Sequence, residues 1–198
     1  MKLTTILIAS VVYLTSQSSM VAAAPYSYDQ TPMKITDVYS DSVLVAHNRP
    51  RVQYGAKPLT WSPELYTSTL QYAKLCKFAS SDSRGKYGEN LYATTTRVAN
   101  VAQAVNSWMA QAPNYNYNNP VFSSNTGKCS QKDYKHVGEH NRGFTQVVWK
   151  SSTQVACAQA ACAAGTIYSQ ASTITICRYA PPGNMQGQFA KNVGRPAA

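Results

Sequence analysis

Apolar residues recur at helical spacing in three stretches of the chain, which are 35–51, 62–76 and 98–109. The second stretch begins with Ser62, Pro63 and Glu64, which are a capping hydroxyl, a proline suited to the first helical position and an acid for the positive helix end. Pro50 lies near the end of the first stretch. Because a helix interior resists proline by about 3 kcal/mol, we expect a kink or an early last turn there.

Later in the chain, three runs rich in β-branched and aromatic residues predict strands, at 144–149, 154–161 and 173–179. The continuous apolar residues 147–149 indicate a strand buried on both faces. At its entrance, Thr145 and Gln146 carry polar groups that the neighbouring backbone must satisfy in a central strand. With helices first and strands late, the order predicts an α+β fold in which helices pack against an antiparallel sheet.

The first 23 residues follow the pattern of a secretory signal peptide. Lys2 precedes an apolar core that is too short to span a bilayer, and small residues lead to an expected cleavage after Ala23. A membrane anchor is the alternative interpretation. No second long apolar run predicts a transmembrane helix. We therefore expect a secreted, extracellular protein with a signal peptide, a flexible N-terminal arm, one domain and a C-terminal tail, at 1–23, 24–34, 35–193 and 194–198.

The net charge of +10 suits an anionic partner such as an acidic polysaccharide or a host or cell-wall surface. However, tight basic clusters occur only at 49–51 and 128–142. A nucleic-acid-binding protein needs a basic stripe or a recognition helix, so no nucleic acid is expected as a partner. A basic surface that keeps the protein soluble is the plainer interpretation.

Common catalytic motifs are missing from the sequence. It contains no Gly-rich phosphate loop, no Gly-x-Ser-x-Gly elbow and no His-Glu-x-x-His. Three histidines and eight acidic residues are a small supply of acid–base groups for a hydrolase. We therefore expect no enzyme, no catalytic residue and no cofactor.

The segment 113–122 combines asparagines and prolines, which demand turns, with three aromatic side chains expected to be exposed: Tyr115, Tyr117 and Phe122. Aromatic faces can cover the rings of a flat apolar ligand, while tyrosine hydroxyls or the amides of Asn114 and Asn116 meet its polar end. The alternative is an ordinary loop whose tyrosines pack on the domain.

Five separated stretches resemble the CAP superfamily, named for cysteine-rich secretory proteins, antigen-five and the pathogenesis-related class-one proteins. They are His47-Asn48-Arg49-Pro50-Arg51, Pro58-Leu59-Thr60-Trp61, Tyr87-Gly88-Glu89-Asn90-Leu91, residues 143–152, and Ile176-Cys177-Arg178-Tyr179 with the following 181–184. The resemblance covers about 35–193 and looks closest to the fungal Pry branch, whose members resemble extracellular sterol and fatty-acid carriers. It implies a three-layer α-β-α sandwich with a central antiparallel sheet.

For the cleft, the resemblance implies two histidines and two glutamates that can hold a divalent metal. Only His47 and Glu89 fall on these positions, while Gln111 and Gly143 occupy the other two. Two ligands do not make a zinc site, which needs at least three protein ligands. We favour a hydrogen-bonded His47–Glu89 pair that holds the first helix to the loop. Replacement ligands at His136 and His140, and with them a metal-dependent hydrolase, are the less favoured alternative.

The functional hypothesis is therefore a secreted, non-catalytic protein that binds and carries sterols or related fatty-acid-like lipids. Sterol-binding Pry relatives use an aromatic loop at the position of Tyr115, Tyr117 and Phe122. The alternative is a pathogenesis-related or effector-like protein that acts at a host or cell-wall surface.

Secretion makes disulfides the expected state of the five cysteines, and their odd number leaves one thiol free or paired between chains. The resemblance implies the pairs Cys76–Cys162 and Cys157–Cys177, each contributing about 3–5 kcal/mol. Cys129 then remains. We predict one reactive thiol per chain when the unfolded, non-reduced protein is titrated with a thiol reagent. A monomer without any reactive thiol would contradict this assignment.

Overall fold

The computed structural model describes residues 35–96, 98–120 and 142–197. The predicted signal peptide and N-terminal arm, as well as Phe122, Cys129, His136 and His140, lie outside the described residues. The elements are α1 (Ile35–Gln53), β1 (Thr60–Trp61), α2 (Pro63–Ala73), β2 (Gly88–Thr94), α3 (Val101–Met109), the 3-10 turn η1 (Ala112–Asn114), α4 (Arg142–Val147), β3 (Gln154–Cys162), β4 (Ser172–Ala180) and α5 (Phe189–Asn192).

The sheet has the strand order β1-β3-β4-β2. β4 pairs antiparallel with both β2 and β3, whereas β1 pairs parallel with β3. The expected antiparallel sheet is present in β2, β3 and β4, and β1 adds a parallel strand at one edge. β1, only two residues long, runs alongside β3 in the same direction, with Thr60 N donating to Thr153 O and Ser62 N to Val155 O.

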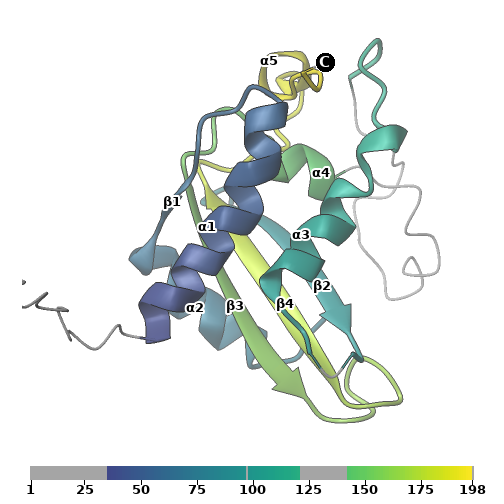
Figure 1. Ribbon diagram of the computed structural model, residues 1–198. Coiled ribbons are helices and arrows are strands. Elements are labelled where there is room, and N and C mark those ends of the chain that lie inside the picture. Colours follow the sequence, from purple (N-terminus) through teal and green to yellow (C-terminus); the bar gives the residue numbers. More distant parts are fainter. Residues whose placement is uncertain (1–34, 97, 121–141, 198) are drawn as a thin grey trace, which may run out of the picture. The chain divides into compact units, whose positions relative to one another are not determined.

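Helices cover both faces of the sheet, as the family resemblance implies. On one face, Val155 and Tyr179 of the strands pack with Val43 of α1 and Val105 of α3. On the other face, Ile174 and Ile176 pack with Ala73 of α2 and with Phe78. Figure 1 looks onto α1 and α3 with the strands behind them. The α+β class and the layered α-β-α arrangement are confirmed.

Local signals in the sequence place the helix starts. Ser62 caps α2 by accepting from Leu65 N, and Pro63 occupies the first turn. α3 begins after Asn100, whose capping box with Gln103 moves the start three residues past the expected one. α1 does not end early at Pro50 but continues to Gln53.

The run 144–149 is not a central strand, and this part of the prediction is wrong. Its first part belongs to α4, in which every residue from Gly143 to Val147 is buried. A short helix buried on all sides has the same continuous apolar pattern as a buried strand, and periodicity alone does not separate them. The polar groups are satisfied within the protein: Thr145 Oγ1 donates to the Asn184 side chain, with Arg142 O as a longer second acceptor, and Gln146 Oε1 accepts from Gly183 N.

Arg51 joins α1 to the segment that follows α4. Its guanidinium is fully buried and donates to four backbone carbonyls: Lys57 (2.8 Å), Val147 (2.8 Å), Trp149 (3.0 Å) and Ser152 (3.0 Å). Burial lowers the pKa of Arg51 to about 10, which leaves the group charged at neutral pH. These bonds hold the last turn of α1 beyond Pro50.

Both disulfides that the resemblance implies are present. Cys76–Cys162 ties the segment after α2 to the end of β3, across 86 residues of sequence. Cys157–Cys177 joins β3 to β4 at directly opposite positions of the ladder. Among the described residues, no helix combines the length and apolar character that a membrane span requires.

We predict that Arg51→Met lowers the free energy of unfolding by about 3–5 kcal/mol, because buried carbonyls lose a charged donor. Arg51→Lys should be less destabilising, because the lysine ammonium keeps the positive charge and can still donate to some of the carbonyls that the planar guanidinium binds. Urea unfolding of dilute protein measures both effects. The exposed Arg49→Met is the matched control and should change stability by about 0.5 kcal/mol or less. Equal effects of Arg51→Met and Arg49→Met would contradict the role of Arg51.

Candidate functional site

His47 lies inside the domain rather than on an open cleft wall. It projects from α1, is fully buried, and its Nδ1 lies 2.8 Å from Val43 O. A carbonyl can only accept, so Nδ1 carries the proton and Nε2 must accept. The partner of Nε2 is the Tyr179 hydroxyl of β4, at 2.9 Å. Both ring nitrogens are therefore used within the protein.

The chain of hydrogen bonds continues from Tyr179 across the sheet. Asn90 of β2 donates through Nδ2 to the Tyr179 hydroxyl at 3.4 Å and to Gly143 O at 3.0 Å. Burial raises the pKa of Tyr179, so its phenol stays protonated and can donate to His47. Desolvation likewise lowers the pKa of His47 to about 4, despite its bond to Val43 O. The group is a neutral structural network.

Gln111 and Gly143, the two departures from the family pattern, contact each other. Gln111 Oε1 accepts from Gly143 N at 2.9 Å and from Phe144 N at 3.3 Å. The amide thereby satisfies two backbone donors at the start of α4. A Cβ on Gly143 would lie 2.9 Å from both Gln111 Oε1 and Trp108 Cδ1, so no larger side chain fits in this arrangement.

Glu89 lies on the opposite face of the sheet from His47, so the expected His47–Glu89 pair is wrong. Glu89 and Asn90 are neighbours in β2, and successive side chains of a strand point to opposite faces. Asn90 takes the His47 side. Glu89 Oε2 instead forms an ion pair with Arg178 Nε at 3.0 Å.

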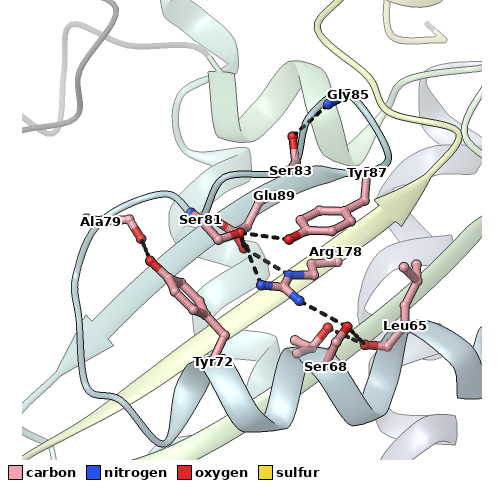
Figure 2. Close-up of polar contacts among 11 residues, drawn as sticks. Leu65, Ser68, Tyr72, Ala79, Ser81, Ser83, Gly85, Tyr87, Glu89 and Arg178 are labelled. Carbon is pink, nitrogen blue, oxygen red and sulfur yellow. Dashed lines mark hydrogen bonds and ion pairs between the residues drawn. The ribbon is translucent and has the colours of Figure 1, made fainter.

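The ion pair is the buried centre of a second network, between α2, β2, β4 and the loop before β2 (Figure 2). Arg178 also donates to Ser68 Oγ and Ser81 Oγ, while Ser81 donates to both Glu89 carboxylate oxygens. The guanidinium carbon lies 4.3 Å from the centre of the Tyr87 ring. Both carboxylate oxygens of Glu89 thus have partners within the protein, and Glu89 holds the loop to the sheet.

These contacts do not fit the metal set that the resemblance implies. His47 and Glu89 are separated by the sheet, Gly143 has no side chain, and Gln111 Oε1 is occupied. The described residues contain one cluster of three metal-ligating side chains, His47 with Cys157 and Cys177, but the disulfide uses both sulfurs.

The aromatic segment is only partly exposed. Tyr115 is 5% exposed and packs against Tyr117 and Phe144, with ring centres 4.7 Å and 5.8 Å apart. The expectation of an exposed Tyr115 is wrong, because its ring completes the core around α4. Tyr117 lies outside it and is half-buried. Asn114 and Asn116 are exposed.

The C-terminal segment covers the outer side of Tyr117. The guanidinium carbon of Arg195 lies 4.8 Å from the centre of the Tyr117 ring, and Nη2 donates to Asn118 Oδ1 at 3.2 Å. Ala197 N donates to Gln53 O at the end of α1. Sequence reasoning missed Arg195, because nothing in the pattern links residues so far apart. It also missed Asn90 and Tyr179, although both stand in quoted motifs.

We predict that the free energy of unfolding falls as the pH becomes acidic and that His47 causes part of this fall. Its pKa is lower in the folded chain, about 4, than the ordinary 6.5, so the unfolded chain binds more protons between these values. Stability is therefore fully present above pH 6.5 and lost as pH falls towards 4, by about 3 kcal/mol. In His47→Gln the slope of unfolding free energy against pH should be smaller in this window. Parallel slopes in urea unfolding series would refute the assignment.

Comparison with known proteins agrees with the fold and the motifs. The family model "CAP: Cysteine-rich secretory protein family" matches residues 44–179. The STS14 protein of Solanum tuberosum is 37% identical over 151 residues, which are 73% of this chain and 62% of that protein. Protein PRY2 of Saccharomyces cerevisiae is 33% identical over 161 residues, 78% of this chain and 41% of that protein. This chain thus spans less than two thirds of each of these relatives.

Among solved structures, this chain is similar to that of Na-ASP-1, with a TM-score of 0.62 and 21% sequence identity. The similarity covers 89% of this chain and 47% of the Na-ASP-1 chain. This similarity shows a shared fold. The sequence motifs, both disulfides and the layered fold agree with the family match. The chain belongs to the CAP family of cysteine-rich secretory proteins.

Proposed function

We propose that this protein is a secreted carrier that binds sterols or related small apolar lipids without converting them. The aromatic segment with Tyr115 and Tyr117 forms part of the binding site, and Phe122, outside the described residues, belongs to the same segment. Family membership and the relative PRY2 support a Pry-like role. Two disulfides suit a protein of an oxidising, extracellular compartment.

One observation carries the proposal: the Tyr115 hydroxyl is buried without a hydrogen-bond partner. Leaving such a group unpaired costs about 1–3 kcal/mol. Burial also raises the pKa of Tyr115 to about 12, so the phenol keeps its proton and remains a donor. A sterol offers one hydroxyl at the end of an apolar plate and would supply the missing partner.

The surroundings of the Tyr115 hydroxyl suit such a ligand. Tyr117 and Phe144 contact the Tyr115 ring, and Tyr54 stacks edge-on against Phe144 at 5.0 Å. Aromatic faces of this kind cover flat apolar rings. In the structure Tyr117 lies over Tyr115, so a ligand reaches the hydroxyl when Tyr117 and its Arg195 contact move aside.

The contacts of His47 and Glu89 support the proposal that the ligand is bound without being converted. His47 has no free ring nitrogen and Glu89 is neutralised by Arg178. A general base needs a group within reach of the substrate proton. Neither side chain meets this requirement in the described arrangement.

The test is equilibrium binding of labelled cholesterol to the purified protein. We expect saturable binding that Tyr117→Ala weakens through lost ring contact. Tyr115→Phe removes only the hydroxyl and should weaken binding by about 2- to 10-fold, the value of one hydrogen bond. Cholest-5-ene, which lacks the hydroxyl oxygen and cannot accept a hydrogen bond from Tyr115, provides the matched ligand, and Tyr115→Phe should reduce the preference for cholesterol over cholestene.

Tyr66→Phe is the control, because Tyr66 packs against the core cluster that contains Ala73 and Ile174 on the other side of the sheet. It should leave the affinity unchanged. The absence of saturable binding to any sterol or fatty acid would refute the function. Binding that survives replacement of Tyr115, Tyr117 and Phe122 by Ala would refute only the site.

A further inference from the structure

The outer face of α1 carries a row of exposed valines that the domain does not use. Val38, Val45 and Val52 are 55%, 68% and 66% exposed. Their spacing of seven residues corresponds to nearly two helical turns, so they follow one line along the helix. The buried residues Val43 and His47 lie on the opposite side of the same helix.

Single exposed apolar residues are ordinary on a protein surface, but an aligned row is less so. Valine is also a weaker helix former than alanine, lysine or glutamate, which suit an exposed helix position better. Neither helix formation nor the core accounts for the row. A surface that packs against another helix does, because apolar residues seven apart form the seam of paired helices.

Charged residues on the same face of α1 indicate which helix packs against the valine row. Asp41 and Arg49 are both exposed and stand four residues before and after Val45. In the part of the chain that the structure describes, the ion pairs are Arg178–Glu89 and Arg84–Asp82, so Asp41 and Arg49 have no ionic partner there. The face is self-complementary: reversing its direction exchanges the acid with the base and Val38 with Val52.

We propose that α1 forms a two-fold symmetric, antiparallel helix pair with α1 of a second copy, centred on Val45. Val45 then contacts Val45 of the second copy, and Val38 contacts its Val52. Asp41 faces Arg49 of the second copy twice, once on each side of the axis. A parallel pair would place Asp41 against Asp41 and Arg49 against Arg49, so the charges select the antiparallel arrangement.

This helix pair is a small interface. Three valines and two ion pairs across one helix face belong to the class of weak, transient contacts below about 1,200 Å². The dimer is therefore reversible and forms at high protein concentration. The valine row lies on α1 alone and uses neither Tyr115 nor Tyr117, so the inference is independent of the proposed lipid site.

Sedimentation velocity of the purified chain over a concentration series tests the pair. We expect a reversible monomer–dimer equilibrium. Val45→Glu places two like charges on the axis and should raise the dimer Kd by at least about tenfold, since such contacts cost several kcal/mol. Val98→Glu introduces the same charge at a valine that is 74% exposed but lies off α1, and should leave the Kd unchanged.

Charge exchange tests the orientation. Asp41→Arg and Arg49→Asp should each weaken the dimer, the double variant should restore it, and a mixture of the two single variants should form heterodimers. Far-UV circular dichroism verifies that each variant is folded. A chain that stays monomeric at every concentration, a dimer indifferent to Val45→Glu, or a double variant no better than the single ones would overturn the proposal.

Discussion

The arrangement of the helical face depends on one buried cation. Arg51 has no carboxylate partner among the described residues and is neutralised by the dipoles of four carbonyls, two of them at and just after the end of α4. A cation is favourable at a helix C-terminus. Only a guanidinium reaches several carbonyls at once with a permanent charge. By fixing the last turn of α1, it also sets the position of His47 one turn earlier.

Strand alternation divides the polar residues of the motifs into two separate networks. Asn90 and Tyr179 join His47 on one face, and their chain neighbours Glu89 and Arg178 form the ion pair on the other. In this protein the polar residues of the family motifs therefore connect the sheet to the helices and to the loop before β2. The candidate lipid site, at Tyr115 and Tyr117, lies outside both networks.

The sequence predicted elements whose signals are local and missed those that depend on partners. The capping residue Ser62 was sufficient to predict the start of α2, and the β-branched run 173–179 was sufficient to predict β4. α4 was misread, because a helix buried on all sides lacks the polar stripe that reveals helical periodicity. Pairing Glu89 with His47 failed because the face to which a strand residue points depends on the register with β4. The burial of Tyr115 depends partly on Phe144, which is distant in sequence and packs against its ring.

Two ion pairs of very different kinds lie along the loop before β2, one between the adjoining strands β2 and β4 and one within the loop itself. Arg178–Glu89 at its base is 3% and 5% exposed, whereas Arg84–Asp82 at its tip is 81% and 74% exposed. Mobile ions screen exposed charges over a Debye length of about 8 Å at physiological ionic strength but enter a buried pair poorly. Rising ionic strength therefore weakens the attraction between Arg84 and Asp82 and leaves the Arg178–Glu89 pair nearly unchanged. The loop keeps its anchorage in dilute and in saline fluids alike.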